Sequence, residues 1–513
     1  MLEENSVGRK STTNGSRTHE TFSVLLLGMS LLVAFVAWAF ASPVASSADD
    51  RFHHTSTWCA WGSWAQCQVG PDGEALVPAQ LADACFTSDS TISAACQKSG
   101  TSEWISPGGA LSSAAGRPLL VYQWQRLFVM NSIETSVLGI RIANAILASL
   151  VLTAALLLVN PVIRRALLVS WMIVSVPMAL FFIPSVNPSG WAIVGVGTFW
   201  AFLYSWLSGA ASSQRRQILV ALGGIGSAAI ALGARFDSGI YLAAGLVAIS
   251  IIAWPTVRHS WWRLAILLAP VPVLLLVATL RLGGLGGALR ITPLVEGAGT
   301  FTNGGFPALA GQILRYAVDL PLLWAGVIGM NRPVFNQTEV FMWGIGQSEV
   351  LMPGLVFMLG ALALGGVLWW AVSDRSVRKW LGVAVILGAV AVTPLLTLVR
   401  FDFTNMSQAR YVAPGVLLLV AVIALVTGDR KTRIGRRQAV LIAGAMSLSG
   451  AVALLATIRR YTNGQSETWL SLSFTPEWWW AGLPHPLWFW LVGAIAWSLF
   501  CFGSIRFITA VAK

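Results

Sequence analysis

The sequence predicts an all-α polytopic membrane protein. Its 513 residues are 56% hydrophobic and only 11% charged, with a mean hydropathy of +0.71, whereas a soluble chain is about 45–50% apolar and roughly 25% charged. So little charge cannot cover the surface of a water-soluble protein of this size. A soluble enzyme, a DNA-binding domain and a disordered scaffold are therefore excluded. Two further observations, the apolar runs and the placement of the basic residues, also predict a membrane protein.

Apolar runs predict the membrane spans. A helix needs about 20 apolar residues to cross the hydrocarbon core of a bilayer, and the chain contains about twelve such runs. They cover residues 21–41, 137–159, 167–184, 191–208, 218–233, 240–257, 264–281, 351–372, 381–399, 412–427, 439–458 and 487–505.

The basic residues predict the orientation of these spans. Alternate loops hold 19 of the 33 lysines and arginines in short segments, such as Arg164 with Arg165 and the cluster within 430–437. Because short cytoplasmic loops collect positive charge, both termini are predicted to be cytoplasmic. The formal net charge of +12 then reflects topology, and no nucleic-acid partner is expected.

The spans divide the chain into seven predicted parts. A cytoplasmic tail (1–20), a first anchor (21–41) and an exported loop with four cysteines (42–136) precede helices 2–7 (137–281). A second, glycine-rich exported loop with interfacial helices (282–350), helices 8–12 (351–505) and a cytoplasmic tail (506–513) follow. A cleaved signal peptide is the alternative for the first span, because Ala39-Phe40-Ala41 is typical of a cleavage site, but its apolar run is long for one.

Four of the five cysteines lie in the first exported loop. Cys59, Cys67, Cys85 and Cys96 predict two disulfides, because exported loops are oxidised. A metal site is the alternative, which the absence of any CxxC pair disfavours. Three pairings are compatible with the sequence and stay open, and Cys501, in the last span, is expected to be a packing residue.

Glycine and tryptophan mark the other two exported segments. The second loop is rich in glycine, and its apolar stretch 306–328 is predicted to lie at the membrane interface. The run Trp478, Trp479 and Trp480 suits an interfacial aromatic belt, with a sugar-binding platform as the alternative.

Polar residues directly after the first span form the first candidate site. Asp49 and Asp50 are followed by His53 and His54, where the chain leaves the membrane. Two carboxylates and two imidazoles can supply a general base or a metal-binding edge that faces a membrane-embedded substrate. The alternative is a hydrophilic stop that ends the helix.

A second group lies at the exported end of the ninth and tenth spans. Arg400 and Arg410 run against the positive-inside trend, so another requirement must favour them there. A bidentate guanidinium suits a phosphate or pyrophosphate, and pairing with Asp402 is the alternative. Gln408 and Tyr411 flank Arg410.

A third group lies near the other exported turns. Arg141 and Asn144 stand near the start of the second span, Asn187 lies in the next exported turn, and Arg235 and Asp237 lie in the one after it. Polar residues at such depths are costly and usually line a cavity. All three groups are predicted to lie on one face of the membrane around one cleft.

The same segments carry a family resemblance. The motifs DDRFHHTSTWC, RIAN, SVNPSG, ARFD and QARYVAP follow one another along the chain. Together they resemble the DUF2142 family of predicted bacterial membrane proteins, over roughly residues 20–430, and the cysteine-bearing loop resembles actinobacterial members. The family is grouped with the GT-C fold glycosyltransferases, which take a sugar from a polyprenyl-phosphate donor on the exported side.

The resemblance implies an enzyme of the bacterial plasma membrane that transfers this sugar to a cell-envelope glycan or lipid acceptor. By position, Asp50 first and Asp49 second match the acidic base, and Arg410 and Arg400 match the ligands of the donor phosphate. Ser189 stands where the family commonly has an acid, so a divalent cation stays open as a cofactor and no metal ligand is assigned. The substrate cleft is expected to include His53, His54, Arg141, Asn144, Asn187, Arg235, Asp237, Gln408 and Tyr411.

Two other functions are compatible with the sequence. Twelve spans with both termini inside are common in transporters and flippases, here for a lipid-linked or anionic solute, although the halves of the chain show no repeat. A non-catalytic envelope scaffold is the third hypothesis. It predicts that Asp49, Asp50, Arg400 and Arg410 can be replaced without loss.

Overall fold

The structure is a computed structural model of the whole chain. It describes residues 7–87, 89–97, 103–107, 120–209, 213–268, 305–330, 344–346, 350–400, 408–425, 434–464, 476–480 and 482–509.

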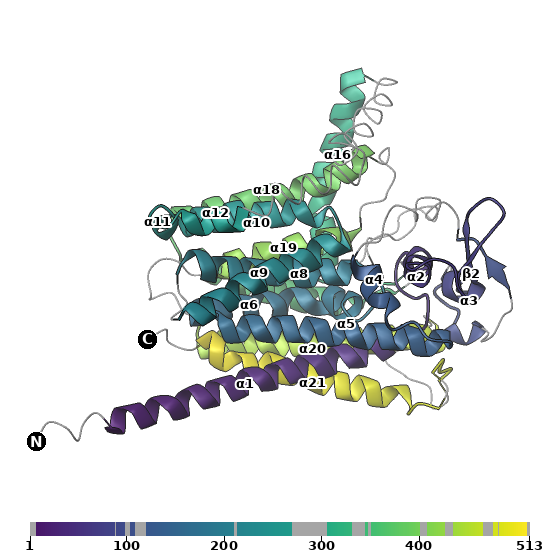
Figure 1. The fold of residues 1–513 in the computed structure, drawn as a ribbon, viewed down its shortest axis with the longest axis horizontal. Helices are drawn as coiled ribbons and strands as arrows, with labels where there is room; N and C mark the ends of the chain where they lie inside the picture. The colour runs from purple at the N-terminus through teal and green to yellow at the C-terminus, as the bar shows by residue number, and fades with distance from the viewer. Residues whose placement is uncertain are drawn as a thin grey trace, which may run out of the picture.

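Long helices dominate the structure, and most of them lie side by side in one bundle (Figure 1). They are α1 (Val7–Phe40), α5 (Ile133–Leu158), α6 (Pro161–Val174), α8 (Ser189–Leu207), α9 (Gln214–Ala234), α10 (Ser238–Ile252), α16 (Gly305–Val327), α17 (Gly354–Ala371), α18 (Val377–Arg400), α19 (Ala409–Ala424), α20 (Arg436–Asn463) and α21 (Pro486–Thr509). Short helices connect them: α2 (Asp50–Trp58), α3 (Ala79–Ala82), α4 (Leu120–Arg126), α7 (Leu180–Phe182), α11 (Trp254–Val257), α12 (Trp262–Leu268), a 3-10 turn (Ala94–Cys96) and a π turn (Ser175–Ala179).

The chain is an all-α polytopic membrane protein, as the composition predicts. Among the described residues, nine helices are long and apolar enough to cross a membrane, and the shorter apolar helices α10 and α19 lie with them. Eleven of the twelve predicted runs therefore coincide with apolar helices. The run 264–281 begins within α12 and otherwise falls outside the described residues.

The helix α16 corresponds to the stretch that we expected at the membrane interface. It runs at a steep angle to the long helices of the bundle (Figure 1) and is not among the nine candidate spans. Its interfacial position, like the division of the chain into exported and cytoplasmic parts, stays a prediction.

The centre of the bundle is formed by α6, α8 and α19. The apolar 18-residue window from α6 through α7 is completely buried, and that of α8 is 83% buried. Gly195 on α8 shows how closely the helices approach, because a Cβ there would lie 2.5 Å from the carbonyl oxygen of Ser227 on α9. Small residues at helix crossings allow such contact, so substitution at Gly195 would force α8 and α9 apart.

Local signals in the sequence explain where the central helices begin. The side chain of Asn160 accepts a hydrogen bond from the amide of Ile163 at 2.9 Å, and Pro161 occupies the first turn of α6. Ser132 caps α5 by accepting from the amide of Thr135. These caps satisfy amide groups that have no partner within the helix.

The described residues of the cysteine segment, 42–136, cover one end of the bundle, which we call the cysteine end. The helix α1 begins and α21 ends at the opposite end (Figure 1). The described part of this segment contains three antiparallel strands, β1 (Gln68–Val69), β2 (Ala75–Pro78) and β3 (Trp104–Ile105), with β2 in the centre.

Two disulfides join the cysteines of this segment. They link Cys59 to Cys67 and Cys85 to Cys96, which confirms the prediction of two bridges and settles the pairing that the sequence left open. Cys501 is buried and free, as expected of a packing residue.

The loop closed by the second disulfide is held by a helix from the far end of the chain. Arg460 on α20 donates from Nη1 to the carbonyl of Ile92 at 2.7 Å, and from Nη2 to the carbonyls of Phe86 at 2.7 Å and Asp89 at 3.0 Å. The guanidinium therefore fixes a loop whose carbonyl groups point at it.

Removal of this disulfide is expected to loosen the loop from α20. The double substitution Cys85→Ser with Cys96→Ser should lower the free energy of unfolding by about 2–4 kcal/mol, and it should expose the loop to protease. Melting of the purified protein and limited proteolysis measure the two effects. Reductant breaks both bridges and should expose the wild-type loop at least as much as the double substitution does; an equally protected loop in the wild type and the double variant would contradict the expectation.

The tryptophan run packs onto the bundle. Trp480 is buried and donates from Nε1 to the carbonyl of Phe40 at 2.9 Å, at the end of α1. Trp479 contacts the ring of Tyr461 edge-on. These contacts tie the last connection to α1 and α20, and they favour an anchoring role at Trp480 over an open sugar platform.

Candidate functional site

The turn between α1 and α2 carries the acidic residues of the candidate site. Asp49 adopts a left-handed backbone conformation (φ 59°, ψ 19°), which is uncommon for a residue other than glycine. Its carbonyl accepts from the amides of Phe52 and His53 and so starts α2. The amide of Ser47 donates to Oδ2 of Asp50 at 2.8 Å. This turn separates the two neighbouring carboxylates.

Arg141 holds the preceding stretch of chain in place. Its Nη1 donates to the carbonyls of Ala39 at 3.0 Å and Ser42 at 2.6 Å, and its Nη2 donates to the carbonyl of Pro43 at 2.8 Å and to Oγ of Ser46 at 3.3 Å. The side chain is only 1% exposed. In this geometry Arg141 supports the turn, with its Nη donors directed to protein oxygens.

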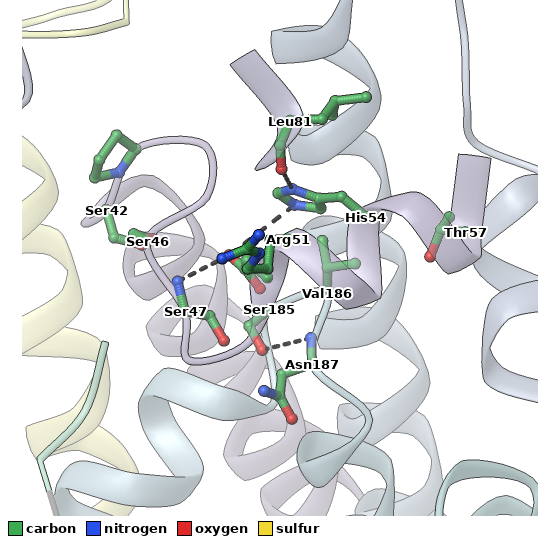
Figure 2. A network of polar contacts seen from close by, with 12 residues as sticks. Ser42, Ser46, Ser47, Arg51, His54, Thr57, Leu81, Ser185, Val186 and Asn187 are labelled. Carbon is green, nitrogen blue, oxygen red and sulfur yellow. Dashed lines mark hydrogen bonds and ion pairs between the residues drawn. The ribbon is translucent and has the colours of Figure 1, made fainter. Parts of the chain in front are cut away.

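Two asparagines tie the turn to the loop before α8. Asn187 donates to the carbonyl of Ala48 at 2.7 Å. Asn144 donates to the carbonyl of Ser185 at 2.7 Å and accepts from the indole of Trp191 at 3.0 Å. Figure 2 shows Asn187 and Ser185 beneath the turn that carries Ser46 and Ser47. Both amides therefore fix backbone in the described structure.

An ion pair joins the turn to α19. Nη2 of Arg410 donates to Oδ2 of Asp49, and these residues are 361 positions apart in the sequence. The Arg410 side chain is 3% exposed and that of Asp49 is 38% exposed. Nη2 also reaches Oη of Tyr411 at 3.1 Å, while Nε has no partner among the described residues. The guanidinium is thus buried beside a carboxylate that solvent can reach.

A second arginine lies against the same tyrosine. Arg235 is 4.3 Å from the centre of the Tyr411 ring, measured from Cζ. It forms a bidentate pair with Asp237, with Nε to Oδ1 at 2.9 Å and Nη2 to Oδ2 at 2.6 Å. Oη of Tyr241 on α10 donates to the carbonyl of Tyr411 at 3.1 Å. Two guanidinium groups therefore flank Tyr411 at the cysteine end.

His53 adds a neutral polar group to this cluster. Its Nδ1 is 2.8 Å from Oη of Tyr122 on α4. Burial lowers the pKa of His53 well below its ordinary value, and the positive charges of Arg410 and Arg235 lower it further. The imidazole is therefore neutral near pH 7, where it can accept or donate a hydrogen bond.

Asp50 and His54 form a separate, completely buried pair. Both side chains are 0% exposed, and Nε2 of His54 lies 4.0 Å from Oδ2 of Asp50. Nδ1 of His54 is 2.8 Å from the carbonyl oxygen of Leu81 on α3. Burial raises the pKa of Asp50, while His54 and Arg141 oppose that shift. A substrate cannot contact these groups in this conformation.

The structure thus divides the predicted site residues into three groups. Asp49, Arg410, Tyr411, Arg235, Asp237 and His53 gather at one place. Arg141, Asn144, Asn187, Asp50 and His54 lie buried around the turn. Gln408 is half-buried at the start of α19, and the side chain of Arg400 falls outside the described residues.

Sequence reasoning missed several residues of the surroundings. Gln125 on α4 accepts from Oγ1 of Thr57 at 2.8 Å and donates to the carbonyl of Val186 at 2.9 Å. Tyr122 on the same helix contacts His53. No motif marks α4, and only its short amphipathic stretch before the second span could have indicated a helix there.

The described residues contain no group of three or more histidine, cysteine, aspartate or glutamate side chains arranged to hold a metal ion.

A family model of predicted membrane proteins, DUF2142, matches residues 32–419, more than half of the chain. The chain belongs to the DUF2142 family. Neither the curated proteins nor the solved structures provide a match. In this DUF2142 protein the matched range includes Asp49 and Arg410, whereas Arg460 and Trp480, which brace the cysteine end, lie beyond it.

Proposed function

We propose that this DUF2142 protein is a membrane glycosyltransferase that transfers a sugar from a polyprenyl-phosphate donor to a cell-envelope acceptor. The observation that carries the proposal is the ion pair between Asp49 and Arg410. It places a solvent-accessible carboxylate beside a buried cation, which are the two groups that transfer from a phosphate leaving group requires.

Arg410 is the proposed ligand of the donor phosphate. Its guanidinium is anchored against the ring of Phe182, 5.8 Å from the ring centre, and against Tyr411 at 5.0 Å. Nε has no partner among the described residues and Nη2 is held by Asp49, so a phosphate that displaces Asp49 gains two donors. Bidentate contact of this kind suits phosphate geometry. Arg235 adds a second positive charge nearby.

Asp49 is the proposed base. When the phosphate takes its place on Arg410, the carboxylate is free to accept the proton of an acceptor hydroxyl. That oxygen then bonds to the anomeric carbon as the bond from this carbon to the phosphate oxygen breaks. The phosphate leaves with its charge compensated by Arg410, and the proton stays on Asp49. His53, Asp237, Gln408 and, outside the described side chains, Arg400 remain proposed contacts of the substrates.

The membrane supplies the environment for the donor. We propose that the cysteine end is the exported side of a bacterial plasma membrane, with both termini cytoplasmic. The lipid tail of the donor would then lie in the bilayer beside the helices while its phosphate reaches Arg410 at the helix ends. A glycan or lipid acceptor would approach from the exported side.

Transfer of radiolabelled sugar tests this proposal. Membranes that contain wild-type protein are supplied with labelled polyprenyl-phosphate sugars, and label in envelope fractions is counted. Asp49→Asn should lower transfer by about 100-fold or more, because removal of a general base typically costs 10²–10⁴-fold. Asp72→Asn is the matched control, since Asp72 is exposed on the β1–β2 turn and should transfer like wild type.

Two outcomes would contradict the proposal. Wild-type activity in Asp49→Asn would exclude Asp49 as the base. Movement of labelled donor across proteoliposomes without any transfer would favour a flippase, the alternative with which the multi-pass layout agrees.

A further inference from the structure

The histidine of the buried pair has a defined tautomer. Nδ1 of His54 is 2.8 Å from the carbonyl oxygen of Leu81, and a carbonyl oxygen can only accept. Nδ1 therefore carries the hydrogen, and Nε2 of the neutral ring presents a lone pair.

That lone pair faces another acceptor. Nε2 lies 4.0 Å from Oδ2 of Asp50, and both side chains are 0% exposed. Neither Nε2 of His54 nor Oδ1 of Asp50 has a hydrogen-bond partner among the described residues. Buried polar atoms without partners are costly. One added hydrogen between Nε2 of His54 and the carboxylate of Asp50 would allow the two groups to form a hydrogen bond.

The charged and polar groups around the pair determine the pH at which it binds this proton. From α5, the buried guanidinium of Arg141 stabilises an ionised Asp50 and opposes a cation on His54. Directly before α2, Asp49 is engaged by Arg410, and on α2 itself His53 is held neutral. From α20, Oη of Tyr461 donates to the carbonyl of Ser46 at 3.2 Å. On α4, Tyr122 faces His53, and Gln125 accepts from the hydroxyl of Thr57 on α2.

We propose that Asp50 and His54 form a proton-binding pair that positions Asp49, and that uptake of one proton by the pair switches the site off as the exported side acidifies. In that step a solvent proton bonds to Nε2, the ring becomes an imidazolium, and it donates to Asp50. The part that concerns activity rests on the proposed glycosyl transfer; the proton-binding part does not.

The geometry explains why the proton affects Asp49. A charged hydrogen bond between Nε2 and Oδ2 is about 2.8 Å long, so the pair must close by roughly 1 Å from its present 4.0 Å. Asp50 is also the acceptor for the Ser47 amide, which fixes the turn that carries Asp49. A displacement of about 1 Å at a catalytic group can lower a rate by about 100-fold.

The direction of the pH effect follows from burial. Burial lowers the pKa of His54 below its ordinary value of 6.5, opposed by Asp50 and the Leu81 carbonyl. His54 is therefore expected to become protonated when the pH falls below this ordinary value. Activity should be present near neutral pH and be lost on the acid side.

Histidine spectroscopy tests the proton-binding pair without any assay of transfer. Protein labelled with ¹⁵N-histidine is titrated by NMR in nanodiscs, and the His54 signals are assigned by their loss in His54→Gln. We expect the Nδ1–H tautomer at neutral pH and protonation of Nε2 below pH 6.5. Asp50→Asn keeps an acceptor for Ser47 but removes the negative charge, so protonation should require at least about a tenfold higher proton concentration; Asp72→Asn should not change it.

Several outcomes would overturn the pair. An Nε2–H tautomer at neutral pH would contradict the proton-binding pair, and so would a titration of His54 that is the same in wild type and Asp50→Asn. If Asp50→Asn does not fold, the tautomer of His54 in the wild type alone tests the pair. In the transfer assay, His54→Gln should move the acid limb of the pH profile to lower pH. An acid limb at the same pH in His54→Gln and wild type would overturn the switch. If His54 titrates as expected but the protein transfers no sugar, only the proposed function is contradicted.

Discussion

Replacement of Arg410 by alanine is expected to lower glycosyl transfer by at least about 100-fold. The substitution removes the buried cation that would compensate the leaving phosphate, and loss of one such electrostatic contact typically costs 10²–10³-fold in rate. It also leaves Asp49 without its partner. Arg410→Lys should retain part of the activity, because it keeps the charge but cannot form two parallel hydrogen bonds. Initial rates with labelled donor measure both.

A matched ion pair at the other end of the bundle provides the control. Arg164 is buried, pairs with Glu20 and lies against the ring of Phe507, near the end of α21 that lies opposite the cysteine end (Figure 1). Arg164→Ala should reduce the amount of folded protein but leave transfer per folded molecule unchanged. Equal losses of transfer per molecule in Arg164→Ala and Arg410→Ala would show that Arg410 acts through stability and not through the substrate.

Replacement of Arg141 by methionine is expected to have the largest effect on stability, a loss of about 3–5 kcal/mol in the free energy of unfolding. Methionine fills a similar volume, but the carbonyls of Ala39, Ser42 and Pro43 lose their donor. These oxygens lie in a buried turn, where unpaired acceptors are costly. Denaturant unfolding in nanodiscs and protease access to the turn measure the loss.

Arg51→Met is the control for Arg141→Met. Arg51 is exposed, and among the described residues it donates to the carbonyl of Pro107 at 2.8 Å. Its replacement should change the free energy of unfolding by no more than about 0.5 kcal/mol, as for most surface substitutions. Similar losses in both variants would mean that the Arg141 contacts contribute little.

The positions of the membrane spans could be predicted from the sequence because the bilayer imposes one strong requirement on each span. Runs of apolar residues are local properties of the chain. They are sufficient to place the helices, whatever the tertiary contacts. The pairing of Cys59 with Cys67 and of Cys85 with Cys96 could not be predicted in this way, because the spacing of the four cysteines is compatible with three pairings.

The candidate site could be predicted in composition but not in geometry. Charged residues near membrane spans are rare, so Asp49, Asp50 and Arg410 were identifiable. Their roles could not be predicted, because the side chains of Asp49 and Asp50 point to different surroundings only once the left-handed turn at Asp49 forms. The same limit applies to Arg141, whose partners are 95 to 102 residues away in the sequence.

The contacts between α20 and the cysteine end have a consequence for the synthesis and folding of the protein. Tyr461 contacts Ser46 across 415 residues, and Arg460 holds the loop of the second disulfide. At a translation rate of about 5–20 residues per second, roughly 20–80 seconds separate the synthesis of the two partners. During that interval the oxidised segment must wait beside a half-inserted bundle. A ribosome that stalls before α20 would leave a disulfide-bonded but unbraced segment for quality-control proteases to recognise.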